Sequence, residues 1–295
     1  MAADLPPHDN PFETPRPAGT SVVQGILRVT VAIQCFGLAV ARWHQGRQTP
    51  FSAMLAQGKG WTTEQVAQFE NGAAMAMAII GVTLLFRPSW LTLMPVLVFQ
   101  AGIATATVVM EHGPHPLFSS LEQAVALAAP LALLLIDFWP PGIRPNLVLT
   151  LSAMALLRLA TVITFVTQGI LALLQFRSGG SLTKVIIQTA QNVAHREVTE
   201  AQAQLALGVI GVVQIALAFS LLMARSKASA LWMAIVGLLS AASRTLAFGM
   251  QGYDLSLLRF AEAGVPFVLL MFWLLAYQEQ PAVILPDRRD MPPSR

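Results

Sequence analysis

The sequence predicts an all-α integral membrane protein with eight transmembrane helices, and three observations lead to this fold class. Hydrophobic residues make up 55% of the 295 residues and charged residues only 11%. An average soluble domain is about one quarter charged, so this composition suits lipid better than water. The apolar residues form continuous runs, and the period-two alternation that an outer-membrane barrel requires is absent. We therefore expect the lipid bilayer as the main partner of the chain.

Eight apolar segments are long enough to serve as transmembrane helices. A span needs roughly 20 apolar residues to cross about 30 Å of hydrocarbon. The segments cover residues 22–41, 70–86, 91–110, 119–138, 148–174, 203–223, 228–249 and 257–277. The flanking segments, 1–21 and 278–295, are rich in proline and are expected to be cytoplasmic tails, the first of them disordered.

The order of polar residues along the spans repeats once, which predicts an internal duplication. Arg28 follows Leu27 in the first span as Arg158 follows Leu157 in the fifth. In each half a long polar stretch, 44–68 or 175–202, separates the first two spans.

The repeat also predicts how the two halves are related. Each unit has four spans, and an even number of spans gives both copies the same orientation in the membrane. We therefore expect two parallel-repeat four-helix bundles, residues 22–140 and 148–277, related by an axis along the membrane normal.

Basic residues in the short links predict the orientation. They gather on one side of the predicted membrane, in Arg87, Arg144, Arg225 and Lys227. The opposite short loops, 111–118 and 250–256, contain no Lys or Arg. We expect a multi-pass protein of the bacterial inner membrane with both termini in the cytoplasm.

Two arginines lie inside the first span of their half, where a charge is costly and is retained for pairing or function. Arg28 and Arg158 are each about two turns from the cytoplasmic end. One interpretation is that they extend toward the lipid headgroups along an apolar stem. The other is that they face the bundle interior and bind an anionic or carbonyl group of a ligand.

The last two spans carry a second set of charges. Arg259 and Glu262 are three residues apart and share a helix face, and Arg244 is expected at a similar depth. These three residues predict a buried Arg–Glu–Arg group, which would offset part of the cost of desolvation. The first half lacks these arginines near Glu122, so we expect that carboxyl group to be protonated and neutral.

The composition argues against several other classes of protein. The net charge is only +3 and the basic residues are scattered, so no nucleic-acid partner is expected. The lone Cys35 excludes an internal disulfide and a thiolate metal cluster. The loop residues Glu111, His112 and His115 lack the spacing of metal ligands on a helix, so we predict no metal site. No cofactor motif is evident in the chain.

The order of these features resembles the DoxX/DoxD-like family of membrane proteins. The resemblance rests on Leu27-Arg28 in the first span, Phe69-Glu70-Asn71-Gly72 at the start of the second and the late Glu262. It would cover nearly the whole chain as two tandem units. The second half departs from the pattern, because Gln204 and Gly208 stand where a Glu-x-x-Gly sequence would be expected. That departure puts a Glu70-like site in the second copy in doubt.

The resemblance implies a subunit or accessory of a quinone-linked redox complex, with quinone as its cofactor and other redox subunits as partners. Two alternatives remain open: a carrier for a small molecule or ion, and a non-catalytic membrane scaffold or assembly factor. Broken helices would favour the carrier, yet Pro95, Pro130 and Pro266 are the only clear helix breakers inside the predicted spans. The candidate ligand-binding residues are Arg28, Glu70, Glu122, Arg158, Arg244, Arg259 and Glu262.

Overall fold

The computed structural model describes residues 20–110, 116–137 and 147–276, and the regular structure within these ranges is helical. Eight helical segments are long and apolar enough to span a membrane, which confirms the predicted fold class. The predicted tails lie almost entirely outside the described residues.

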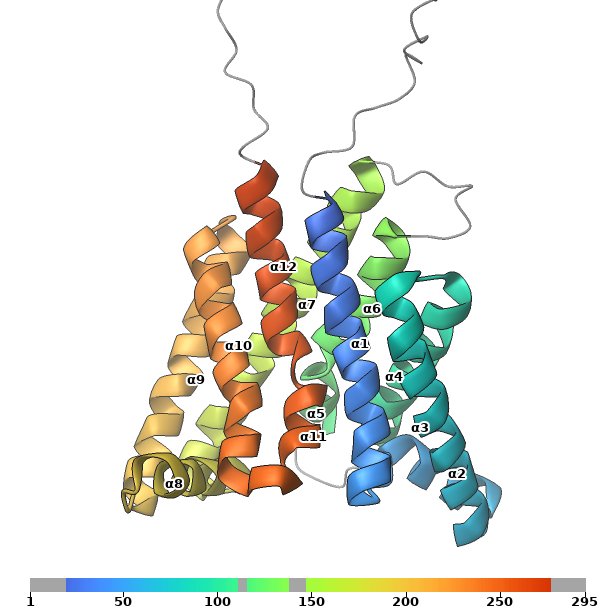
Figure 1. The fold of residues 1–295 in the computed structure, drawn as a ribbon. Coiled ribbons are helices and arrows are strands. Elements are labelled where there is room, and N and C mark those ends of the chain that lie inside the picture. The colour runs from blue at the N-terminus through green and yellow to red at the C-terminus, as the bar shows by residue number, and fades with distance from the viewer. Residues whose placement is uncertain (1–19, 111–115, 138–146, 277–295) are drawn as a thin grey trace, which may run out of the picture.

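The same order of helices occurs in both halves: a spanning helix, a helix outside the spans, two spanning helices, and a last span divided into two segments (Figure 1). In the first half these are α1 (Thr20–Gln45), α2 (Pro50–Lys59), α3 (Thr63–Phe86), α4 (Trp90–Met110), α5 (Pro116–Leu121) and α6 (Ala124–Ile136). In the second half they are α7 (Leu147–Ser178), α8 (Ser181–Ala194), α9 (Glu200–Met223), α10 (Lys227–Phe248), α11 (Tyr253–Leu258) and α12 (Ala261–Ala276). A 3-10 turn, η1 (Gly249–Gln251), precedes α11. This order agrees with the predicted duplication, and superposition of the two halves stays a prediction.

The packing partners of the helices also correspond between the halves. Helix α1 packs on α3 as α7 packs on α9, and α4 packs on α6 as α10 packs on α12. Across the halves, α1 contacts α11 and α12, while α7 contacts α5 and α6. The first helix of each half therefore lies against the last span of the other half, and the two halves share one hydrophobic interior.

The last span of each half is interrupted, in contrast to the continuous spans predicted over 119–138 and 257–277. The first break separates α5 from α6, and the second separates α11 from α12. At the second break the N–H of Glu262 donates to the carbonyl of Arg259 at 3.0 Å, a tight three-residue turn in place of the α-helical bond. Hydropathy does not reveal such a turn, because the whole segment Tyr253–Leu275 remains apolar enough to be read as one span despite Arg259 and Glu262.

The long polar stretches between the first two spans of each half contain the short helices α2 and α8. Helix α2 begins where the Thr49 hydroxyl accepts from the N–H of Ser52 and Pro50 occupies the first helical position. It ends at Gly60, whose φ of 64° is the left-handed conformation that favours glycine.

The second spans, α3 and α9, begin with the same type of N-terminal helix cap. Thr62 and Gln65 form a capping box at the start of α3, in which each side chain bonds the backbone N–H of the other. Thr199 and Gln202 form the same box at the start of α9. This shared start is a further feature that corresponds between the halves.

The two ends of the molecule differ. The short helices α2, α5, α8 and α11 lie at one end, here called the short-helix end (Figure 1). The first residue of α1 and the last residue of α12 lie at the other, the terminal end. Fully buried apolar side chains fill the interior toward the terminal end, among them Leu27, Val31, Leu133, Leu157 and Leu269. The outer faces of α3 and α9 expose large apolar side chains such as Met75 and Val209, as contact with lipid requires.

Candidate functional site

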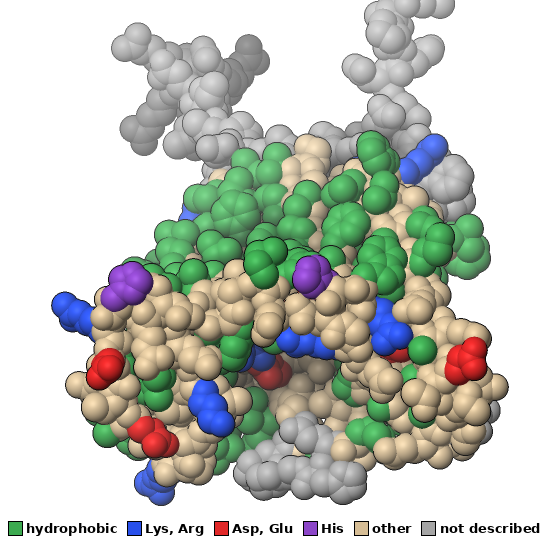
Figure 2. All heavy atoms as spheres, turned by 60° about the horizontal axis from the view of Figure 1, so that its bottom comes forward, with side chains coloured by type: hydrophobic (Ala, Val, Ile, Leu, Met, Phe, Trp, Pro, Cys, Tyr) green, Lys and Arg blue, Asp and Glu red, His purple; other side chains and the backbone are tan. Residues whose placement is uncertain are grey.

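A cavity of about 340 Å³ lies between the two halves near the short-helix end. Figure 2 shows that end hollowed at its centre, with acidic and basic side chains inside the hollow. Side chains from both halves line the cavity, and they come from α1 and the link that follows it, α3, α4, the α5–α6 break and the α11–α12 break. The interrupted spans therefore place their breaks at the wall of one cavity.

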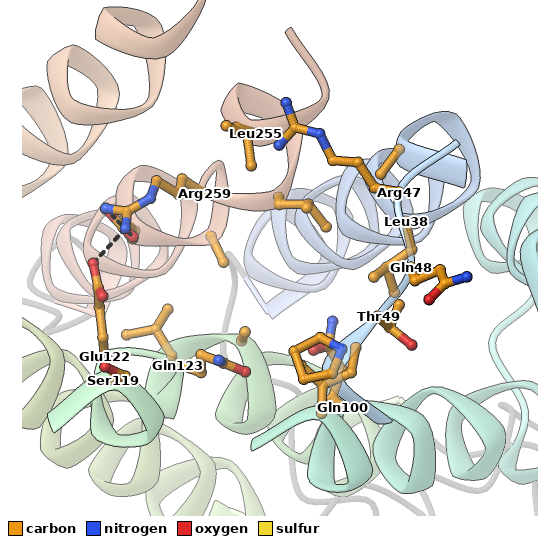
Figure 3. A pocket seen from close by; sticks show the side chains of 18 of the residues that line it. Leu38, Arg47, Gln48, Thr49, Gln100, Ser119, Glu122, Gln123, Leu255 and Arg259 are labelled. Carbon is orange, nitrogen blue, oxygen red and sulfur yellow. Dashed lines mark hydrogen bonds and ion pairs between the residues drawn. The ribbon is translucent and has the colours of Figure 1, made fainter. Parts of the chain in front are cut away.

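The two breaks are joined by an ion pair. The Nη2 atom of Arg259 lies 2.5 Å from Oε1 of Glu122, in the other half of the chain (Figure 3). The Nη1 atom of Arg259 lies 3.5 Å from Oε1 of Glu262, one turn further along its own span. One guanidinium thus contacts a carboxylate from each half.

This geometry corrects one expectation and refines another. Glu122 was expected to lack a cation and to be neutral, but it has the shortest contact to Arg259, because the fold brings the two breaks together. The pairing of Arg259 with Glu262 was predicted and is present. Arg244 interacts electrostatically with Glu122 and Glu262, but within the described chain it forms no ion pair shorter than 4 Å.

A second wall of the cavity is formed by α3 and α4. Glu70 is only 2% exposed and lines the cavity. Its Oε1 atom accepts from the N–H of Thr49 at 2.9 Å and from the Thr49 hydroxyl at 2.7 Å. Gln100, which is 5% exposed, lines the same wall, and Figure 3 shows its side chain across the cavity from Arg259. This wall carries a carboxylate and an amide that are almost completely enclosed by protein.

The link between α1 and α2 lines the cavity and contacts the second half of the chain. The Arg47 guanidinium lies 3.3 Å from Oδ2 of Asp254, whose side chain is fully buried, and donates to the carbonyl of Gln251 at 3.2 Å. Thr49, two residues later, is held by Glu70. The link is therefore attached to α11 of the second half and to α3 of the first.

The two arginines of the first spans lie away from this cavity. Arg28 forms an ion pair of 2.5 Å with Asp137, the residue that ends α6. Arg158 donates to the carbonyls of Leu221 at 2.9 Å and Leu222 at 2.8 Å, in the last turn of α9. Both side chains satisfy acceptors at helix ends, and cations are favourable there. Of the seven predicted candidates, the structure brings Glu70, Glu122, Arg259 and Glu262 to one cavity, with Arg244 close behind it.

Sequence reasoning missed several polar residues of the cavity. Gln100 and Gln123 are the only amides in their spans, and an amide in a span is itself a signal of a polar interior. Arg47 and Asp254 lie in polar segments, where nothing in the local sequence marks them as partners. Only the packing of α1 on α11 brings them together.

The described residues contain no group of three His, Cys, Asp or Glu side chains placed to hold a metal ion. The predicted interfacial loop with Glu111, His112 and His115 lies outside the described residues. The donors and acceptors of the cavity are instead carboxylates, guanidiniums, amides and a hydroxyl. Such groups bind and orient a small polar molecule by hydrogen bonds and charge.

Comparisons of the chain with protein-family models, curated proteins and solved structures find no match. The similarity to the DoxX/DoxD-like family therefore stays a prediction.

Proposed function

We propose that the protein is a carrier for a small polar solute, with the cavity between the two halves as its binding site. The observation that supports this most is the pair of interrupted spans whose breaks meet at the cavity and are linked by Arg259 and Glu122. Membrane carriers built from internal repeats bind their substrates at such discontinuous helices, between the repeats. A static scaffold has no need of breaks that place charges at a cavity in the membrane.

The shape of the interior supports the same function. The cavity lies near the short-helix end, and tightly packed apolar side chains, including Leu133, Leu157 and Leu269, fill the interior toward the terminal end. A site open toward one side and closed on the other is one of the two states that alternating access requires. The basic short links favour a cytoplasmic terminal end in a bacterial inner membrane, so the cavity would open to the periplasm.

The resemblance to a quinone-linked redox subunit leads to a different expectation for the site. A quinone ring carries no charge, whereas the largely apolar wall of this cavity also holds the charged side chains of Glu70, Glu122 and Arg259. The redox role stays a prediction of the resemblance, and co-purification of quinone with partner subunits would support it over a carrier.

A solute-uptake experiment tests the proposed function. Purified protein would be reconstituted in liposomes, and swelling would be followed in iso-osmotic glycerol, glycine, propylammonium chloride and sodium propionate. We expect protein-dependent entry of at least one solute, strongly reduced by R259Q. The matched control is R177Q at the end of α7, an arginine that does not line the cavity. Entry that is the same in empty liposomes, or that is unaffected by R259Q, would contradict the proposal.

A further inference from the structure

The charges around the cavity do not balance. Its wall, together with the side chains directly behind it, contains four carboxylates and three guanidiniums among the described residues. The carboxylates are Glu70, Glu122, Asp254 and Glu262, and the guanidiniums are Arg47, Arg244 and Arg259. One carboxylate is therefore left without a cation.

The unbalanced carboxylate is Glu70. Arg47 contacts Asp254, and Arg259 contacts Glu122 and Glu262, with Arg244 acting on the same two carboxylates. Glu70 forms no ion pair within the described part of the chain, and its two hydrogen bonds come from Thr49, a neutral residue.

Glu70 also has an acceptor atom that the fold does not use. Both bonds from Thr49 end on Oε1, and Oε2 accepts no hydrogen bond from the described residues. Oε2 is not among the fully enclosed polar atoms that lack a partner, and Glu70 lines the cavity. The residue as a whole is only 2% exposed.

At the position of Glu70, a carboxylate that has no counter-charge is energetically unfavourable unless a ligand supplies one. Glu70 is the eighth residue of α3, which puts it roughly 10 Å along the helix from Thr63. A charge without a counter-charge at membrane depth is unfavourable and is retained mainly where it serves function. A cation that enters the cavity would remove that cost.

We propose that Glu70 is the cation-binding residue of the cavity and that the solute carries a protonated amine. An ammonium group has three donors and no acceptor. Oε2 of Glu70 takes one donor, and Gln100, which lines the same wall, has an amide oxygen that can accept another. The cavity volume of about 340 Å³ is at the small end of small-molecule sites, so the solute is small. This inference deepens the proposed function and rests on the same cavity.

Calorimetric titration of the purified full-length protein tests the inference. The probes are propylammonium chloride and sodium propionate, a cation and an anion of similar size, at one pH and one ionic strength. We expect the wild-type protein to bind propylammonium in preference to propionate. E70Q should lower the affinity for propylammonium at least tenfold, because it keeps the bonds to Thr49 and removes the charge. E64Q is the matched control, because Glu64 is exposed on the same helix.

A second variant keeps the test decisive if E70Q folds poorly. Q100E adds a carboxylate to the same wall and should tighten propylammonium binding without creating propionate binding. Three results would overturn the inference. They are an affinity of E70Q for propylammonium equal to that of the wild type, a wild-type protein that binds propionate more tightly than propylammonium, and a wild-type protein that does not bind propylammonium. Sodium chloride is titrated as a third probe. Binding of sodium that depends on Glu70, without binding of propylammonium, would also overturn the inference.

The outcome is separable from that of the proposed function. Binding of propylammonium that depends on Glu70, without uptake into liposomes, would contradict the carrier and leave the amine site standing. Uptake of another solute that is unaffected by E70Q would contradict the amine site and leave the carrier standing.

Discussion

The guanidinium of Arg259 lies 2.5 Å from the carboxylate of Glu122, a residue 137 positions earlier in the chain. The contact joins the breaks of two corresponding spans at the wall of one cavity. Their side chains are 25% and 20% exposed, so the pair is only partly shielded from solvent. It is shorter than the Arg47–Asp254 pair, which also joins the two halves beside the cavity.

A double-mutant cycle measures this link. R259Q and E122Q should each lower the free energy of unfolding in mild detergent by about 1–3 kcal/mol, because each leaves a partly buried charge unpaired. The double variant should cost little more than the worse single variant, with a coupling energy of about 1–2 kcal/mol. Additive losses would show that the two residues do not stabilise each other.

E122Q should destabilise the protein at least as much as E262Q, because Glu122 makes the shorter contact.

Arg28 and Arg158 correspond in sequence, but substitutions of the two arginines should affect stability in different ways, because their partners differ. D137N removes the charge that pairs with Arg28, so R28Q and D137N should be non-additive when thermal unfolding is measured. The Arg158 side chain bonds two backbone carbonyls of α9, which no substitution of a side chain removes. R158Q should therefore cost about 1–2 kcal/mol on its own. A strong coupling of Arg158 to Asp137 would contradict these assignments.

Gly237 lets α10 approach α12 next to the cavity. A Cβ atom at this buried position would meet the backbone carbonyl of Glu262, which cannot move aside without shifting α12. G237A should lower the free energy of unfolding by more than about 2 kcal/mol. G72A is the matched control, since nothing lies within 4 Å of the added atom. It should be neutral or stabilising by up to about 1 kcal/mol, and equal effects of the two variants would contradict the close packing.

Labelling of engineered cysteines with a membrane-impermeant maleimide tests the topology. G58C in α2 and E197C before α9 lie at the short-helix end, and both positions are exposed. R225C lies in the exposed turn between α9 and α10, at the terminal end. In intact spheroplasts we expect labelling of the first two, and labelling of R225C only after permeabilisation. The buried native Cys35 provides a low background. Labelling of all three from one side would contradict the eight-span fold, and the reverse pattern would contradict the orientation.

The sequence was a good guide to the spans and a poorer one to the interior. Apolar runs predict helices of membrane length, because crossing lipid demands them whatever the neighbours are. The repeat of Arg28 as Arg158 could also be recognised in the sequence. The breaks within the last spans could not be predicted from hydropathy, because each interrupted span still reads as one apolar segment.

The candidate site could be predicted in part for a similar reason. Arg259 and Glu262 are one turn apart, so local geometry alone predicts their contact. Glu122 and Arg259 are distant in sequence, and their pairing depends on how the halves pack. Arg28 and Arg158 are equivalent in sequence but bind different acceptors, because Asp137 ends α6 in the first half and α9 presents free carbonyls in the second.

The central claim is that the cavity between the halves is the site of a carrier, and its accessibility from both sides of the membrane tests that claim most directly. Ala126 lines the cavity on α6, so A126C places one thiol there without adding charge. A small, water-soluble, impermeant thiol reagent would be applied to right-side-out and to inside-out vesicles. We predict that the thiol reacts from the short-helix side and also, more slowly, from the terminal side, because a carrier exposes its site alternately. Reaction from the short-helix side alone under every condition would contradict a carrier.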